Sequence, residues 1–266
     1  MTKAAQMTAY AENLKIGCFA GSGIGKTVGI GSLIKAYGAE NVGVISCEHG
    51  LTSIASLLDS DHIKVCDSLD DLRAAHRWAA ERYGSPHQWV CVDGGSRVLQ
   101  WIEQEVWGGV EAAYAESLSG SVGSSNQQWM PFITKKDGIN TQRVWSKVGS
   151  NAERLFNAFV KLPGSSYWTF WEQLTNIDQY TKGPPMIIDS PGEGTRKAAK
   201  GTFDFIYRLT RVQGKLVAKF RNDAVSYAKL REDWNANIHV PDEIVEFDLA
   251  DFCERVRGKG WPQSGK

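Results

Sequence analysis

The chain has 266 residues, of which 42% are hydrophobic and 23% charged, and its 30 Lys and Arg balance its 30 Asp and Glu. This size fits one large α/β domain with a substantial core. No apolar run reaches the ~18 residues that a membrane-spanning helix needs, and no secretory signal is evident. The five cysteines form no Cys-x-x-Cys pair and the histidines show no metal-ligand spacing, so we expect reduced thiols, no structural zinc and no membrane partner.

The first predicted elements surround a glycine-rich motif. After a polar lead-in at 1–12, residues 14–19 predict a buried strand and residues 26–37 predict a helix. Between them, the sequence matches the pattern G-x-x-x-x-G-K-[ST] with alanine in place of the first glycine. This context predicts a phosphate-binding loop whose backbone N–H groups surround a phosphate. The nucleotide-binding residues would be Gly21, Ser22, Gly23, Ile24, Gly25, Lys26 and Thr27, with Lys26 on the β- and γ-phosphates and Thr27 on Mg²⁺.

Two acidic residues follow the next strands. Residues 42–46 predict a strand whose continuous apolar run suits a parallel sheet covered on both faces. Residues 63–66 and 88–93 predict two further strands, and 68–83 and 97–114 predict helices. Asp93 ends the strand at 88–93 and fits a carboxylate that holds Mg²⁺. Glu48 comes just after the strand at 42–46. Because strand ends beside a phosphate-binding loop face the γ-phosphate, Glu48 is a candidate base for an attacking water.

The second half of the chain predicts two long loops and a group of strands. Residues 116–140, rich in Ser, Gly, Asn and Gln, form the first candidate loop, and 145–162 predict a helix. A strand at 167–171 is followed by Gln173, whose amide is placed to contact the γ-phosphate or its water. A second candidate mobile loop covers 175–201. Strands at 205–212, 215–220 and 226–230 then predict an antiparallel extension. Together these elements predict one α/β domain at 13–257 and a flexible tail at 258–266.

The charge is unevenly distributed. Residues 181–231 contain eleven Lys and Arg and four Asp and Glu, a net of +7, whereas 232–257 contain eight acidic and two basic residues, a net of −6. The basic segment either binds a polyanion or pairs with the acidic one, in this or a neighbouring subunit. Lys219 with Arg221, and Lys229 with Arg231, each place two cations on one strand face. Such a pair can complete a neighbouring subunit's active site by neutralising transition-state charge.

In this order of motifs the chain resembles the RecA-like P-loop ATPases, and most nearly the small phage-type Sak group. The resemblance implies a mostly parallel central sheet flanked by helices, with a C-terminal antiparallel β extension. It implies that Glu48 is the catalytic glutamate, that Asp93 ends the Mg²⁺-binding strand and that Gln173 senses the γ-phosphate. Lys229 and Arg231 would act in trans on a neighbouring subunit's ATP. The loop after Gln173 would bind DNA through Lys182, Arg196, Lys197 and Lys200. The sequence departs from the pattern at Gly94 and Gly95, at Gly29 and Gly31 in the helix after the loop, and in the length of 116–140.

The function implied by the resemblance is ATP binding and hydrolysis, stimulated by single-stranded DNA, in recombination or annealing. The protein would assemble as a filament or ring in the cytoplasm of a bacterium or a phage-infected host cell, with ATP and Mg²⁺ as cofactors. A single-strand-binding or annealing protein is a further candidate partner. Three alternatives stay open: a ring-forming DNA motor or helicase-type ATPase, a small-molecule kinase, and a nucleotide-dependent scaffold with little turnover.

Overall fold

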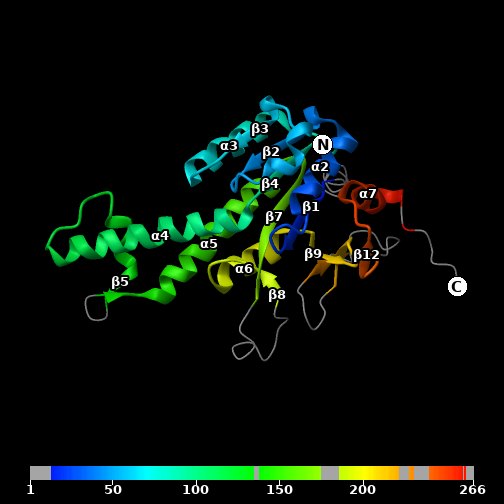
Figure 1. Ribbon diagram of the computed structural model, residues 1–266. Coiled ribbons are helices and arrows are strands. Elements are labelled where there is room, and N and C mark those ends of the chain that lie inside the picture. The colour runs from blue at the N-terminus through cyan, green and yellow to red at the C-terminus, as the bar shows by residue number, and fades with distance from the viewer. Residues whose placement is uncertain are drawn as a thin grey trace, which may run out of the picture.

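The computed structural model describes residues 13–134, 138–174, 186–221, 228–230, 240–259 and 261. It confirms the expected α/β fold, with a mostly parallel central sheet, helices on both faces and antiparallel strands toward the C-terminus (Figure 1). None of the helices in these ranges is both long and apolar enough to cross a bilayer.

The central sheet has ten strands, and eight of them follow the order β12-β10-β9-β1-β7-β4-β2-β3. The strands are β1 (Lys15–Ala20), β2 (Val42–Ser46), β3 (Ile63–Val65), β4 (Trp89–Asp93), β7 (Ser165–Leu174), β8 (Met186–Ile188), β9 (Phe205–Val212), β10 (Lys215–Lys219), β11 (Lys229–Leu230) and β12 (Glu243–Val245). The strands from β9 to β3 are parallel, whereas β10, β11 and β12 pair antiparallel, as does β8 with β7. Strand β7 therefore separates the strand that leads into the phosphate-binding loop from the strand that ends in Asp93.

Helices cover both faces of the sheet and enclose two cores. On one face lie α2 (Lys26–Tyr37) and α7 (Leu249–Glu254), followed by a π-helical turn at Arg255–Lys259. On the other lie α3 (Leu69–Arg82), α4 (Gly95–Leu118), α5 (Thr141–Val160) and α6 (Gly192–Thr202). Short 3-10 turns, η1 (Ala39–Asn41), η2 (Leu51–Leu57) and η3 (Ser60–His62), connect the first strands.

The two glycines inside α2 have a packing role. A Cβ on Gly31 would lie 2.8 Å from Ile54 Cγ2, and one on Gly29 would lie 3.0 Å from Tyr167 Oη. Each glycine costs about 1 kcal/mol against alanine in a helix interior. The cost is offset because the helix can approach β7 and η2 closely, which holds the phosphate-binding loop against the sheet.

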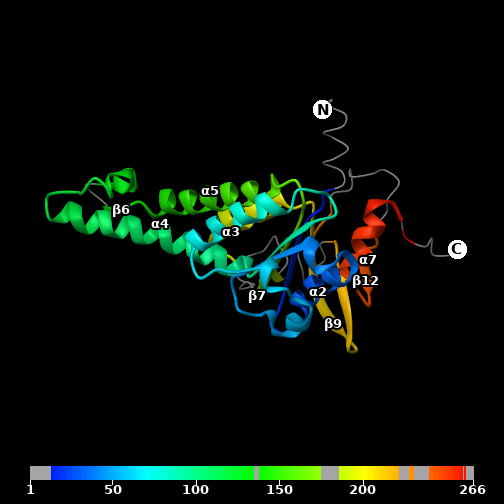
Figure 2. The same cartoon turned by 90° about the horizontal axis from the view of Figure 1, so that it is seen from above.

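Helices α4 and α5 form an arm that extends away from the sheet (Figures 1 and 2). Its far end carries η4 (Gln127–Phe132) and a small hairpin of β5 (Ile133–Thr134) and β6 (Gly138–Ile139). The composition of 116–140 predicts a loop, but much of this stretch has regular structure. Trp129 packs against α4, since a Cβ on Gly109 would lie 2.3 Å from Trp129 Cε2.

The second expected loop, 175–201, also needs correction in its latter part. Residues 186–188 form β8 and residues 192–202 form α6, while 175–185 lie outside the described residues. Helix α6 buries Ala198 and Ala199 and lies against α5, where Gly149 and Gly194 allow close backbone approach. Glycines at 192, 194 and 201 make this stretch look like a loop in the sequence, but Gly194 lies against the backbone of Gly149 and so permits close packing of α6 on α5.

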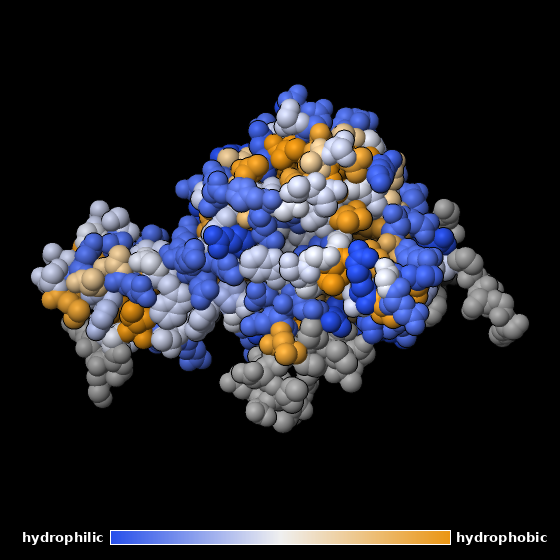
Figure 3. Space-filling view, in the orientation of Figure 1, coloured by the Kyte–Doolittle hydropathy of each residue, from blue (hydrophilic) through white to orange (hydrophobic). Residues whose placement is uncertain are grey.

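The basic and acidic segments pair with each other within this chain. Ion pairs join Lys215 to Glu246 and Lys219 to Glu243, both at 3.0 Å, and Arg221 to Asp242 at 2.7 Å. They run across β10 and β12 and the adjoining residues, where neighbouring antiparallel strands bring opposite charges together. In the orientation of Figure 3, hydrophilic residues cover much of the surface, with apolar patches between them.

Lys15 gives a prediction on stability. This buried lysine donates hydrogen bonds from Nζ to Leu162 O and Gly164 O, and burial lowers its pKa to about 8, against the opposing effect of Asp204. Above pH 8 the folded protein releases this proton while the unfolded chain keeps it, so stability rises with pH. Between pH 8 and 9.5, the free energy of unfolding of the wild type should rise by about 1–2 kcal/mol relative to that of Lys15→Met. Denaturant unfolding of both proteins measures this difference, and a constant difference would contradict it.

Candidate nucleotide site

The predicted phosphate-binding loop connects β1 to α2 in a conformation that requires glycine. Gly23 and Gly25 have φ angles of 73° and 124°, which side chains rarely adopt. Lys26 begins α2, and its Nζ donates hydrogen bonds to Ala20 O at 2.9 Å and Gly21 O at 3.1 Å. The ammonium group is therefore folded over the loop, close to the helix N-terminus, where a phosphate would be bound.

Asp93 and Thr27 meet at the edge of the sheet beside this loop. Thr27 Oγ1 donates to Asp93 Oδ2 at 3.3 Å, and Thr169 Oγ1 donates to Asp93 Oδ1 at 2.7 Å. Burial raises the pKa of Asp93, and the bonds from Thr169 and Thr27 oppose that rise. A hydroxyl and a carboxylate are the oxygen ligands that Mg²⁺ takes beside nucleotide phosphates. The donor set thus fits the expected metal.

Glu48 lies at the same edge, after β2. Its Oε2 accepts a hydrogen bond from Trp171 Nε1 at 2.8 Å, while its Oε1 is buried and accepts no hydrogen bond from the residues that the structure describes. Burial, followed by the charge of Asp93, raises the pKa of Glu48 to about 7. A carboxyl group with a pKa near neutrality is suited to take a proton from water.

The two glycines after Asp93 make room for this arrangement. Gly94 has a φ of 111°, and a Cβ there would lie 2.6 Å from Glu48 Cγ; one on Gly95 would lie 2.4 Å from Phe170 Cε1. Larger residues at these positions would displace Glu48 or the core. The glycines at these two positions therefore have a steric cause.

Gln173 is exposed near the end of β7, and side-chain alternation places it on the same face as Thr169 and Trp171. Glu172 lies on the opposite face, where its Oε2 accepts from Arg208 Nε at 2.5 Å. A Cβ on Gly21 would be 3.6 Å from Glu172 Oε1, so this ion pair lies beside the phosphate-binding loop. Neither residue of this pair carries a motif that predicts a role from the sequence.

The remaining predicted cations lie elsewhere. Lys229 Nζ donates to Lys200 O and Phe203 O, near the C-terminal end of α6. Lys219 and Arg221 pair with the acidic segment, as described above. Arg231 and Lys182 lie outside the described residues. The trans role expected for Lys229 would require its contacts to α6 to be replaced.

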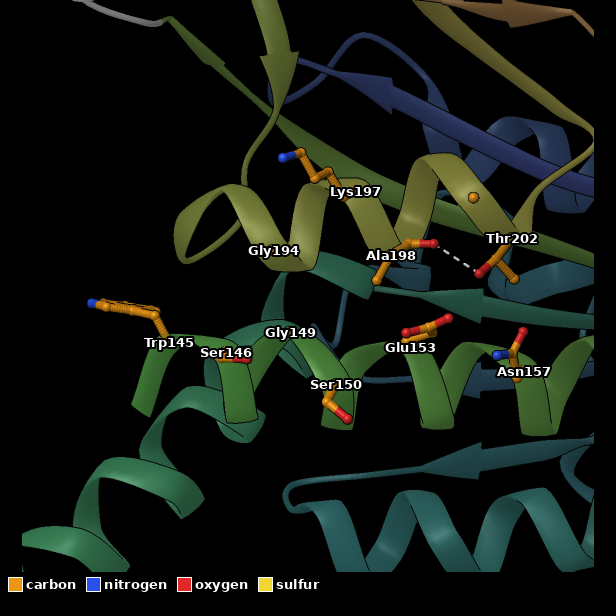
Figure 4. Close-up of a pocket in the computed structure, with 11 residues that line it drawn as sticks. Trp145, Ser146, Gly149, Ser150, Glu153, Asn157, Gly194, Lys197, Ala198 and Thr202 are labelled. Atoms are coloured by element: carbon orange, nitrogen blue, oxygen red, sulfur yellow. Dashed lines mark hydrogen bonds between the residues drawn. The ribbon is translucent and has the colours of Figure 1, made fainter. Parts of the chain in front are cut away.

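Three of the predicted DNA-binding residues, Arg196, Lys197 and Lys200, lie on α6. Lys197 is exposed and pairs with Glu193 at 3.0 Å. Beside α6, a groove of about 480 Å³ runs along α5 and is lined by Trp145, Ser146, Gly149, Ser150, Glu153, Asn157, Gly194, Lys197, Ala198, Gly201 and Thr202. Figure 4 shows Trp145 at one end of this groove and Glu153 and Asn157 toward the other.

Three residues that support the site were missed in the sequence. Thr169 orients Asp93, Trp171 bonds to Glu48, and Ser96 binds the backbone of Trp171. Thr169, Trp171 and Gln173 alternate along one strand, so the prediction of Gln173 as a site residue could have extended to the other two.

No protein-family model and no curated protein matches the chain. Among solved structures, a KaiC-like protein of Pyrococcus horikoshii OT3 aligns at 12% identity, with a TM-score of 0.40, over 78% of this chain and 77% of its own. The RadB recombinase aligns at 10% identity, with a TM-score of 0.41, over 78% and 80%. The type III secretion ATPase EscN of enteropathogenic E. coli aligns at 17% identity, with a TM-score of 0.41, over 75% of this chain and 43% of its own. At this level of similarity, function has to be inferred from the chain's own residues.

Proposed function

We propose that the protein is a RecA-like enzyme that binds and hydrolyses ATP and acts on single-stranded DNA in recombination or annealing. The observation that supports this most strongly is the gathering of Lys26, Thr27, Asp93 and Glu48 at one edge of the sheet. Lys26, Thr27 and Asp93 suffice for binding of the nucleotide with Mg²⁺. The buried Glu48 carboxyl group, whose Oε1 accepts no hydrogen bond within the described part of the chain, favours hydrolysis over binding alone.

Each residue has a role that follows from its position. The loop N–H groups and Lys26 would hold the phosphates, and Thr27 and Asp93 would hold Mg²⁺, which neutralises charge on the phosphates when bound. Glu48 would accept a proton from water through Oε1. Gln173 would contact the γ-phosphate or that water from the end of β7.

The nucleic-acid part of the proposal is supported by α6. Arg196 and Lys197 are adjacent on α6, and Lys200 follows them by four and three residues. The helix therefore gathers their charges along one side. Such cations bind phosphates largely independently of sequence. We propose that the protein works as a filament or ring, with Lys229 and Arg231 as candidates for contacts between subunits.

Lys197 provides the mutational test of this interface. Its ion pair with Glu193 is exposed, so Lys197→Gln should leave the fold intact. The variant should bind single-stranded DNA more weakly, and the slope of log K against log salt should fall by about 0.7, as expected for one lost phosphate contact. Fluorescence anisotropy with a labelled oligonucleotide measures both. Lys35→Gln, an exposed lysine on α2 on the other face of the sheet, is the matched control.

The same assay tests the proposed function itself. With ATP and Mg²⁺ present, the wild type should bind single-stranded DNA at low salt and release it at high salt. If no nucleic acid binds in any nucleotide state, the recombination function is wrong, and a kinase or scaffold becomes the better hypothesis.

A further inference from the structure

Trp171 connects two parts of the molecule that the proposed function uses separately. Its indole Nε1 donates to Glu48 Oε2 at 2.8 Å. Its backbone N–H donates a hydrogen bond to Ser96 Oγ at 3.0 Å, and its backbone O accepts one from Asp189 N at 2.8 Å. The residue is thus held at three points while its side chain reaches the candidate catalytic glutamate.

The bond to Glu48 selects which carboxylate oxygen is available. Oε2 is occupied by the indole N–H, and the buried Oε1 accepts no hydrogen bond from any described part of the chain. When one oxygen of a carboxylate is fixed by a hydrogen bond, the orientation of its second oxygen is also defined. Since a misplacement of about 1 Å can cost ~100-fold in rate, the orientation of this group matters for hydrolysis.

The backbone contacts of Trp171 lead to α6. Ser96 Oγ, at the start of α4, accepts from Trp171 N and donates to Asp189 O at 2.7 Å. Asp189 follows β8 and precedes α6, which carries the cations Arg196, Lys197 and Lys200. Ser96, Trp171 and Asp189 therefore form a closed set of three hydrogen bonds, here called the Ser96 node, between the nucleotide site and the basic helix.

We propose that Trp171 is a positioning residue for Glu48, and that the Ser96 node transmits displacement of β8 and α6 to that glutamate. Nucleic acid bound at α6 would in this way regulate hydrolysis. The inference rests on the proposed function, because it assumes that Glu48 acts in hydrolysis and that α6 binds nucleic acid.

Trp171→Phe tests the positioning role, since it keeps an aromatic ring and removes the N–H. Expected is a fall in kcat of at least about tenfold, with the KM for ATP changed by less than about twofold. Trp78→Phe is the control, because the Trp78 Nε1 is buried and has no hydrogen-bond partner in the described ranges. A wild-type kcat in Trp171→Phe would overturn the proposal. Absence of hydrolysis by the wild type would instead overturn the proposed function.

A double variant separates positioning from a general loss of structure. If Trp171 acts through Glu48, Trp171→Phe should slow the wild type but leave the residual rate of Glu48→Gln unchanged. An equal fold-loss in both backgrounds would show that Trp171 acts independently of Glu48 and would contradict the inference.

Hydrogen exchange tests the Ser96 node, first on the wild type and then on a variant that removes the Ser96 hydroxyl. Single-stranded DNA should slow exchange of the amides of Trp171 and Asp189 by at least about threefold, because both are donors in the node. Ser96→Ala should abolish this change and reduce stimulation of hydrolysis by DNA. DNA binding, shown by anisotropy, without any change at these amides would overturn the coupling.

Discussion

Glu48→Gln is expected to reduce ATP hydrolysis by about 10²–10⁴-fold while leaving ATP binding within about twofold of the wild type. Glutamine has nearly the shape of glutamate, and its carbonyl oxygen can still accept the bond from Trp171. It cannot accept a proton from water, so only the chemical step should be lost. Phosphate release measures the rate, and a fluorescent ATP analogue measures binding.

A matched variant distinguishes this result from a general effect of removing a carboxylate. Glu111 is exposed in the second half of α4, away from the start of that helix beside Asp93. Glu111→Gln should therefore hydrolyse ATP at the wild-type rate. If Glu48→Gln also hydrolyses at the wild-type rate, another group takes the proton and the assignment of Glu48 is wrong.

Lys26→Ala is expected to weaken ATP binding by about 10–100-fold, because a hydrogen bond to a charged group contributes about 1.5–3 kcal/mol. Hydrolysis should fall further, since charge neutralisation at the phosphates is also lost. The variant loses the bonds from Nζ to Ala20 O and Gly21 O, so a melting curve should accompany the measurement. Lys35→Ala, in the last turn of the same helix, should bind ATP normally. Unchanged affinity in a folded Lys26→Ala would show that the loop does not hold the phosphates.

The sequence predicts the strand, turn and helix around 20–27 well because the signals for them are local. A strand, a glycine-rich turn and a helix follow one another in the chain, so the local sequence is enough to predict the loop at 20–27. The sequence also predicts that Glu48 and Asp93 lie close together, because the carboxyl ends of parallel strands share one edge of the sheet. The structure places both residues at that edge, with Glu48 and Asp93 close enough for the charge of one to raise the pKa of the other.

What the sequence could not predict depends on contacts between distant segments. The glycines at 192, 194 and 201 predict a loop locally, but α6 forms because it can lie closely against Gly149 of α5. The strand β12 and its ion pairs with β10 appear only when both segments are placed in one sheet. Lys229 looked like a free cation on a strand face, but in the structure it donates to carbonyls at the end of α6.

The supporting residues of the site were missed for a related reason. Ser96 and Trp171 carry no motif of their own, and their importance lies in hydrogen bonds between residues 75 and 123 positions apart. The pair Gly94-Gly95 looked like a departure from the family pattern. The space taken by Glu48 and Phe170 explains why glycine is needed there.

The most direct test of the central claim is the rate of phosphate release from Mg²⁺-ATP as single-stranded DNA is titrated, for the wild type and Glu48→Gln, at low and high salt. The wild type should hydrolyse ATP faster as DNA is added, high salt should weaken this stimulation, and Glu48→Gln should stay inactive throughout. Turnover by the wild type that no nucleic acid changes would contradict a DNA-dependent ATPase. Turnover by Glu48→Gln at the wild-type rate would contradict the proposed catalytic role of Glu48.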